Sequence, residues 1–347
     1  MKTITLIKQY LLLFMLGAFL IGCSSDEEPP VVADETPEEE EMMDPVDPED
    51  TSGLVLNFTT ETEEDQIGQF ASNAMVEYND NVWVVGGHVG FGAPYFTQTN
   101  QVWRSENGRN WLSVSVDQFP ARSGHTLTVI NDRMYMIGGV NFDTSELFND
   151  IWSSTDGLTW TLEEDEPVFG TISNHTITLF NGRWYLVYGS SVWSSLNGVD
   201  WTLETDTAFE SRNNHKTVVF NNELYVVGGL LTDGSALNEI WKSSDAIQWE
   251  QVTPTGDIFQ PRSNHTLTVY NNKVFLIAGR NGTTIYRDIY YSEDMINWTS
   301  YELEEDADGS SDGLYSHNIL LYNDAMWLFG GYNSSGASST IQSIKEE

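Results

Sequence analysis

The stretch that decides the fold is RSGHTLTVINDRMYMIGG, residues 122–139. After His125, polar and apolar residues alternate as far as Ile130, which is typical of a half-buried β-strand. Asn131 and Asp132 then favour a tight turn, and a second apolar run ends in two glycines. The stretch therefore predicts a β-hairpin that ends in a crowded, glycine-bearing loop.

This unit recurs along the chain. Five of the six histidines stand at its start, spaced 50, 40, 50 and 52 residues apart: His125, His175, His215, His265 and His317. The second strand of each copy ends at Gly86-Gly87, Gly138-Gly139, Tyr188-Gly189, Gly228-Gly229, Ala278-Gly279 or Gly330-Gly331. In five copies an aromatic strand follows, and a late tryptophan follows that strand: Trp111, Trp160, Trp201, Trp249 and Trp298. Six copies without helical periodicity predict an all-β fold, with Asn73 in place of histidine in the first copy.

Repeats of this length, with paired glycines and a late tryptophan, resemble the kelch repeat. The resemblance covers roughly residues 69–345 and implies a six-bladed β-propeller of four-stranded blades, within a domain of residues 53–347. The last copy lacks a fourth strand. We therefore expect Leu54–Phe58 to add to it as the outermost strand and close the ring.

The N-terminus predicts export and a lipid anchor. Residues 1–22 have a basic start and an apolar core that is too short for a membrane span. They end at Leu20-Ile21-Gly22-Cys23, which resembles the lipobox of bacterial lipoproteins and implies lipidation of Cys23. An ordinary secretory signal is the alternative. Because Cys23 is the sole cysteine, the exported domain cannot contain a disulfide.

Residues 23–52 predict a disordered acidic tether, because Ser24–Asp50 has thirteen Asp or Glu and no Lys or Arg. Its start, Ser24-Ser25-Asp26-Glu27-Glu28, resembles the export signal of surface lipoproteins in Bacteroidota. The resemblance implies an outer-membrane protein exposed at the cell surface. A net charge of −37 excludes nucleic acid as a partner, because phosphate binding needs a basic patch.

The candidate ligand-binding residues lie on one face. Strand parity places the segment before each histidine and the loop after each glycine pair on the same side of the ring, here called the upper face. Arg122, Arg212 and Arg262 precede histidines there and suit bidentate recognition of a carboxylate or sulfate, with Arg280 adding to the patch. The alternative is that each arginine pairs with an acidic neighbour in an adjacent blade.

The first upper loop, residues 88–97, adds aromatic candidates. Tyr95 and Phe96 lie in it and suit contact with a sugar ring or a peptide side chain. Aromatic residues of other upper loops add to this rim: Phe142, Tyr286 and Tyr332. The alternative is a loop that folds over the channel mouth and needs no ligand.

We expect the protein to bind no metal ion and no cofactor. A ring of histidines is too wide for one ion to touch three, so we expect neutral imidazoles that bond a neighbouring blade's backbone. Asp306, Asp308 and Asp312 form the one calcium candidate, in a loop that lacks the closing glutamate of an EF-hand.

The resemblance leaves two functions open. The leading hypothesis is a non-catalytic module on the cell surface that binds a glycan or a protein. We expect it to be a monomer that is anchored to the membrane through Cys23. The alternative is a sugar mutarotase or epimerase of the sialic-acid mutarotase type, which needs an arginine and a free carboxylate at the channel mouth. The copper oxidases of the superfamily are excluded, because their cofactor needs a cysteine within the propeller.

Overall fold

The computed structural model describes residues 54–62, 67–89, 97–114, 117–303 and 312–347, and its named elements are all β-strands. Cys23, the acidic segment, Tyr95, Phe96, Asp306 and Asp308 lie outside the described residues. No helix long and apolar enough to cross a membrane occurs in the described ranges.

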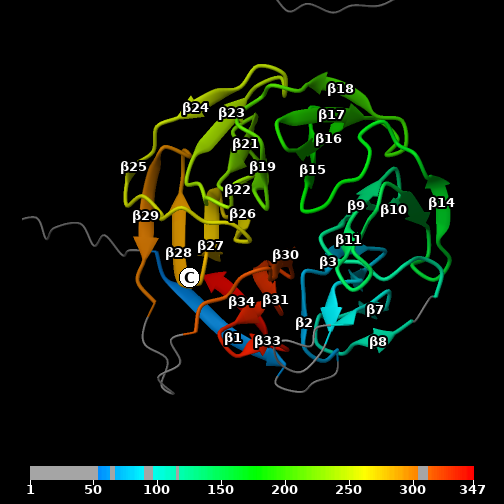
Figure 1. Cartoon of the computed structure of the whole chain (residues 1–347). Coiled ribbons are helices and arrows are strands. Elements are labelled where there is room, and N and C mark those ends of the chain that lie inside the picture. Colours follow the sequence, from blue (N-terminus) through cyan, green and yellow to red (C-terminus); the bar gives the residue numbers. More distant parts are fainter. Residues whose placement is uncertain (1–53, 63–66, 90–96, 115–116, 304–311) are drawn as a thin grey trace, which may run out of the picture. The chain divides into compact units, whose positions relative to one another are not determined.

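Most strands belong to six antiparallel sheets that surround a central channel as the blades of a propeller (Figure 1). Blade 1 contains β3 (Ala74–Tyr78), β4 (Asn81–Val85), β7 (Val102–Ser105) and β8 (Leu112–Ser113). Blade 2 contains β9 (Thr126–Ile130), β10 (Arg133–Ile137), β13 (Ile151–Ser154) and β14 (Thr161–Glu164). Blade 3 contains β15 (Thr176–Phe180), β16 (Arg183–Tyr188), β17 (Ser191–Ser195) and β18 (Thr202–Thr205).

The remaining three sheets follow the same plan. Blade 4 contains β20 (Lys216–Phe220), β21 (Glu223–Val227), β23 (Ile240–Ser243) and β24 (Glu250–Val252). Blade 5 contains β26 (Thr266–Tyr270), β27 (Lys273–Asn281), β28 (Thr284–Ser292) and β29 (Asn297–Tyr301), with β25 (Thr255–Gly256) parallel to β29. Blade 6 contains β30 (Asn318–Tyr322), β31 (Ala325–Phe329), β34 (Ile341–Glu346) and β1 (Leu56–Thr62).

Short ladders tie the upper-face loops together. They pair β2 (Phe70–Ala71), β5 (His88–Val89) and β6 (Thr97–Gln98); β11 (Val140–Asn141) and β12 (Glu146–Leu147); β19 (Arg212–Asn213) and β22 (Leu230–Leu231); and β32 (Tyr332–Asn333) and β33 (Gly336–Ala337). Isolated bridges such as Ser123–Val140 also join a segment before a histidine to a loop after a glycine pair. The two kinds of loop therefore share one face, as strand parity predicts.

The inner hairpin of each blade turns through two residues with positive φ. In blade 2 these are Asn131 and Asp132, at 50° and 58°, between the paired residues Ile130 and Arg133. Such angles define a type I′ turn, whose twist matches that of the strands it joins. The Asn, Asp and Gly pairs that the sequence has at these six places are the residues that tolerate this conformation best.

The hydrophobic core lies between blades. Each of six clusters takes its residues from two neighbouring sheets, so every blade is held through both of its faces. One cluster joins Val82 and Val84 of blade 1 to Trp327 and Phe329 of blade 6. The first and last blades therefore pack as any other pair does.

The sheet of blade 6 is completed by the N-terminal strand. β1 pairs antiparallel with β34, from Leu56 opposite Glu346 to Thr62 opposite Ile341, and is the outermost strand. This is the partner expected for the apolar stretch at Leu54–Phe58, although the strand begins two residues later than that stretch. Leu56 is buried against Phe275 and Ile277 of blade 5, which explains why an outer strand has an apolar residue there.

Candidate functional site

The mouth of the channel is a closed ring of six backbone hydrogen bonds. The N–H of each ring residue donates to the carbonyl of its counterpart in the preceding blade: Ser72 to Ser316 (3.1 Å), Ser316 to Asn264 (2.9 Å), Asn264 to Asn214 (3.2 Å), Asn214 to Asn174 (3.1 Å), Asn174 to Gly124 (2.7 Å) and Gly124 to Ser72 (3.3 Å). All six residues have φ between 53° and 61°. Hydrogen-bonded backbones lie about 5 Å apart, so a hexagon of such bonds has its corners about 5 Å from its centre. The mouth therefore admits a narrow molecule.

The residue after five of the six ring positions is the repeated histidine, which is buried. Its Nε2 lies within hydrogen-bond distance of a threonine hydroxyl in the preceding blade: His175 with Thr126 (3.0 Å), His215 with Thr176 (3.2 Å) and His317 with Thr266 (2.8 Å). For these three histidines the partner of Nε2 is a hydroxyl, where the sequence predicted a backbone group of a neighbouring blade; at His125 it is the backbone of Val85 in blade 1 that acts on the ring. Burial lowers the pKa of four of the five histidines to about 3 and that of the fifth well below 6.5; the four are His125, His175, His215 and His317, and the fifth is His265. The ring of imidazoles is therefore neutral at physiological pH.

Blades 6 and 1 depart from this pairing in a matched way. Asn73 replaces the histidine of blade 1, and Asn318 replaces the threonine of blade 6 that would face it. The amide of Asn318 donates to Asn73 Oδ1 at 2.9 Å. Ala74 stands at the threonine position of blade 1, and neither ring nitrogen of His125 has a hydrogen-bond partner in the described structure.

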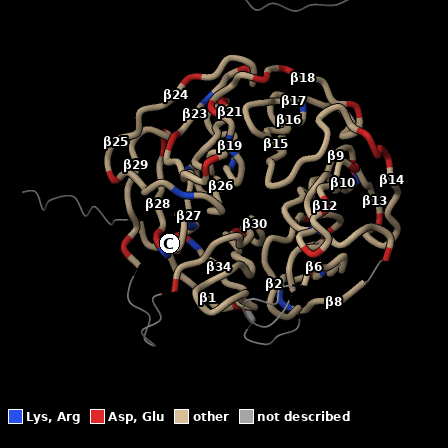
Figure 2. Tube along the Cα trace, viewed as in Figure 1, with Lys and Arg blue, Asp and Glu red and all other residues tan. Residues whose placement is uncertain are grey.

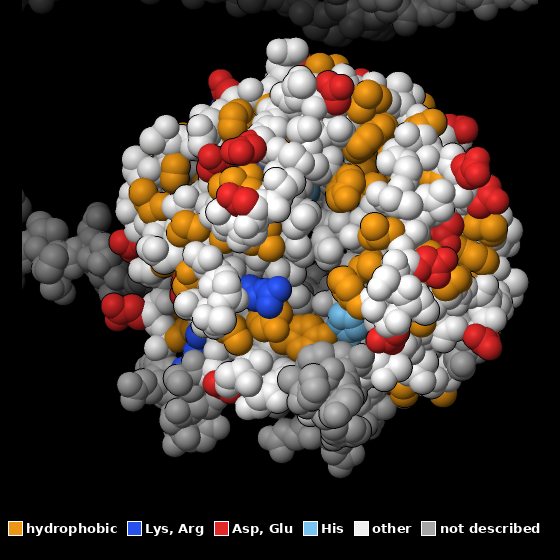
Figure 3. Space-filling view, in the orientation of Figure 1, with side chains coloured by type: hydrophobic (Ala, Val, Ile, Leu, Met, Phe, Trp, Pro, Cys, Tyr) orange, Lys and Arg blue, Asp and Glu red, His pale blue; other side chains and the backbone are white. Residues whose placement is uncertain are grey.

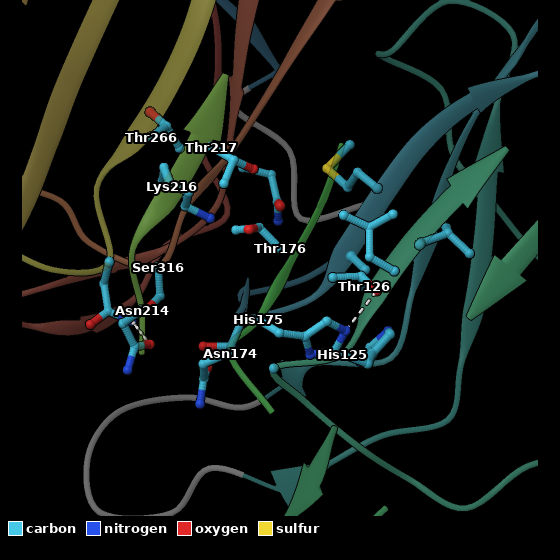
Figure 4. A pocket seen from close by; sticks show the side chains of 18 of the residues that line it. His125, Thr126, Asn174, His175, Thr176, Asn214, Lys216, Thr217, Thr266 and Ser316 are labelled. Atoms are coloured by element: carbon cyan, nitrogen blue, oxygen red, sulfur yellow. Dashed lines mark hydrogen bonds between the residues drawn. The ribbon is translucent and has the colours of Figure 1, made fainter. Parts of the chain in front are cut away.

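Blade 4 has Lys216 at the threonine position. Lys216 lines a cavity of about 340 Å³ inside the channel. Hydroxyl, amide and aliphatic groups line it too, and so do the six residues of the hydrogen-bonded ring at the mouth. Figure 4 shows its side chain pointing into the channel between strands of different blades. Burial lowers the pKa of Lys216.

The three repeated arginines are in the protein interior. Arg122, Arg212 and Arg262 are at most 1% exposed, and each forms an ion pair with a carboxylate of the blade that it leads into. The partners are Asp150, Glu239 and Asp288, at 2.5, 2.7 and 2.5 Å. The pairs lie within blades, not between neighbouring blades as the sequence suggested.

Arg122 shows how completely such a guanidinium is used. Its donors reach the carbonyl groups of Pro120 and Gly138 and both carboxylate oxygens of Asp150, and its plane lies 3.9 Å from the centre of the Phe148 ring. Its own carbonyl accepts from Gly87 of blade 1. The residue therefore joins two blades and has few donors left for a ligand, in contrast with the expected binding role.

A continuous row of aromatic and cationic side chains crosses the upper face, and it is here called the aromatic row. Arg280 lies 4.5 Å above the ring of Tyr315, which lies 5.2 Å from Tyr332. Tyr332 contacts His88, and His88 contacts Phe142, at centroid distances of 6.0 and 6.1 Å. The row thus runs from blade 5 through blades 6 and 1 to blade 2.

The aromatic row has an inner, fixed part and exposed ends. Tyr332 is buried and shares a hydrogen bond with Nδ1 of His88, while Nε2 of His88 lies 3.0 Å from the Gln98 amide. Phe142 is 62% exposed, and no ion pair of Arg280 is found among the described residues. Figure 3 shows hydrophobic side chains, a cationic group and a histidine around the centre of the ring.

The other predicted site residues contribute little here. Asp312 is exposed and accepts a hydrogen bond from Ser334. Within the described ranges, no group of three or more His, Cys, Asp or Glu side chains is placed to hold a metal ion. Phe142 and Tyr332, which the sequence suggested as further aromatics of the upper face, belong to the row. No repeated pattern pointed to Tyr315 or His88, which join them.

Comparisons with known proteins agree on the fold. A family model described as the KLHDC2/KLHL20/DRC7 Kelch-repeats domain matches residues 214–345. A solved structure titled "Structure of YjhT" has a TM-score of 0.63 with this chain at 13% sequence identity, over 81% of this chain and 95% of that chain. No curated protein matches the sequence. An identity this low supports likeness of fold and nothing finer.

Proposed function

Because this chain is a kelch-repeat β-propeller, we propose that it is a non-catalytic binding module that holds an extended ligand across its upper face. The observation that carries the proposal is the aromatic row, which offers aromatic and cationic contacts over four consecutive blades. Tyrosine, other aromatic residues and arginine contribute strongly to recognition surfaces, because they bury a large area at a small entropic cost. A peptide strand or a glycan chain fits such a row better than a compact small molecule does.

The charge on the upper face also supports a non-catalytic binding module. Arg122, Arg212 and Arg262 are held by carboxylates, so they do not form a pocket for an acidic sugar. A mutarotase or epimerase of the sialic-acid type is the alternative function, and it needs a carboxylate free to move a proton. Asp150 instead accepts both an arginine fork and the indole N–H of Trp152.

The binding test uses a soluble chain, Ser24–Glu347, on a glycan array and against a displayed peptide library. We expect a ligand in one of the two sets, with an affinity that falls about tenfold when Phe142→Ala removes the exposed end of the row, in line with a loss of about 1.4 kcal/mol. Leu196→Ala is the matched control, because Leu196 is 59% exposed and lies in a strand 3 to strand 4 hairpin on the opposite face.

Three results bear on the proposal in different ways. Absence of ligands from both sets, or equal loss in Leu196→Ala, would contradict it. Accelerated anomerisation of a sialic acid by the wild-type chain would favour the mutarotase.

We also propose that the module acts at the outer face of the outer membrane, anchored through Cys23. The support is the sequence of the N-terminus alone. Two or more acyl chains on this residue hold a protein firmly, whereas one chain is marginal.

A further inference from the structure

Lys216 breaks a pattern that three other blades keep. Thr126, Thr176 and Thr266 stand at the corresponding positions, and each places its hydroxyl against the histidine of the next blade. Lys216 cannot do this for His265, and neither ring nitrogen of His265 has a partner among the described residues. A threonine here would complete the pattern, so the fold itself gives no reason for a lysine.

Lys216 also has no counter-ion among the residues that the structure describes. No hydrogen bond or ion pair of its ammonium group with a described residue is found, although the chain has 52 acidic residues and only 15 lysines and arginines. The titratable groups that face it are His265, His215 and His317, which are neutral. A cation in a channel without an anion carries a cost of desolvation that a bound anion would offset.

Hydroxyl groups in the lining of the same cavity can donate hydrogen bonds. The Nδ1 atoms of His175 and His317 are buried without a partner. A buried nitrogen that lacks a partner costs more as an N–H donor than as an acceptor, so each proton belongs on Nε2 and is donated to the threonine. The hydroxyl protons of Thr126 and Thr266 are then left to point into the channel.

The channel lining also has an aliphatic part besides these histidines and threonines. Met75, Ile177 and Ile319 line the same cavity, come from three different blades and are only partly buried. The cavity of about 340 Å³ is larger than a single ion needs. A ligand with a small apolar part would therefore fill space that a halide leaves open.

We propose that the channel binds a small aliphatic monocarboxylate, whose carboxylate pairs with Lys216 and whose short chain contacts the aliphatic side chains. One cation matches one negative charge, and a second charge would remain unpaired in a channel with no other cation among its lining residues. A carboxylate also accepts hydrogen bonds from an ammonium group and from hydroxyl groups at the same time. The site lies inside the ring and does not depend on the aromatic row.

The test measures the melting temperature of the full chain in a non-ionic detergent with sodium butyrate, formate, chloride, succinate or the neutral butyramide. A bulky sulfonate keeps the ionic strength constant. We expect a saturable rise with butyrate, a smaller effect of formate, and none of butyramide, because ligand that binds the folded state raises its stability. Calorimetry gives the Kd directly.

Lys216→Thr is the decisive variant, since it restores the pattern of the other blades. We expect it to fold and to lose the butyrate response, with Kd raised at least tenfold; Lys216→Met serves if it does not fold. Lys345→Thr removes an exposed charge and should keep the response.

Equal responses of wild type and Lys216→Thr, or equal responses to butyrate and butyramide, would overturn the proposal. An equal response to chloride would reduce the site to a halide site and overturn it as well. Phe142→Ala should keep the butyrate response, so failure of this proposal and failure of the upper-face proposal are separable.

Discussion

The residue that precedes each histidine must adopt a left-handed backbone, because only then can its N–H and carbonyl point to the two neighbouring blades. The chain has Gly, Asn or Ser at all six places, and φ is 56° at Asn174 and 53° at Ser316. Glycine and asparagine adopt this region at low cost, whereas a β-branched residue would strain it. A close approach of the next blade sets a similar demand at Gly86, where a Cβ would lie 2.8 Å from the carbonyl oxygen of Arg122.

Buried neutral histidines predict a loss of stability in acid. Burial lowers the pKa of His125 to about 3, below the value near 6.5 of an unfolded chain. Its contribution is complete above pH 6.5 and is lost as the pH falls from 6.5 toward 3, since the unfolded state then binds the proton that the folded state refuses. We expect the urea midpoint of His125→Asn to fall less between pH 7.5 and pH 5 than that of the wild type.

A second histidine variant and the double variant test this prediction further. His265→Asn should give a similar effect, because His265 is also buried without a partner, and the double variant should flatten the profile further. Identical slopes in all four proteins would show that these imidazoles do not govern the acid response.

At the scale of the element, β1 is the clearest test of how a blade is completed. Leu56 is 5% exposed and packs into the cluster between blades 5 and 6, whereas its neighbour Val55 is 44% exposed. Leu56→Ala should lower the free energy of unfolding by about 2–5 kcal/mol, because it opens a cavity. Val55→Ala should change it by less than about 0.5 kcal/mol, and urea titration distinguishes the two. Equal small effects would mean that β1 contributes little to blade 6.

The elements were predictable because each copy repeats local signals. Alternation, Asn-Asp turns and glycine pairs act within about twenty residues, so six copies reinforce one prediction. The aromatic row was predictable only in part. The sequence suggested Phe142 and Tyr332 as upper-face aromatics, but their contacts with His88 and Tyr315 depend on how neighbouring blades pack. The three arginines showed the limit of the repeat itself. Their recurrence indicated that Arg122, Arg212 and Arg262 are important. Because all three are buried, their role is to stabilise the blades.

The sequence already shows that Lys216 departs from the repeat, but a search for recurring residues does not detect such a departure. Aligning the copies on their histidines places threonine after three of them and lysine after one. A departure from a repeat is informative only when the role of the usual residue is known, and the hydrogen bond between Thr176 and His215 supplies that role.

For the whole molecule, charge is as important as packing. Acidic residues are spread around the outside of the ring, with few lysines or arginines between them (Figure 2). Self-repulsion of this kind destabilises a compact state, and salt screens it. We expect the urea midpoint to rise as sodium chloride increases from about 0.02 M to about 0.3 M, where the screening length shortens from roughly 20 Å to below 8 Å.

Lys216→Thr is the control for the salt experiment, because chloride could otherwise act by binding near Lys216. A rise in both proteins is the expected result. A rise in the wild type alone would assign the effect to the channel and not to the surface charge.

The hydrogen-bonded ring at the mouth has an electrical consequence. Its six N–H···O=C hydrogen bonds follow one another head to tail around the axis, so their bond dipoles circulate and the vector sum is close to zero. A helix terminus, by contrast, sums its dipoles into a field that selects the sign of a ligand's charge. An ion that approaches the mouth along the axis is therefore neither favoured nor rejected by the ring. Selection by charge falls to Lys216 beyond it, and the ring selects by width alone.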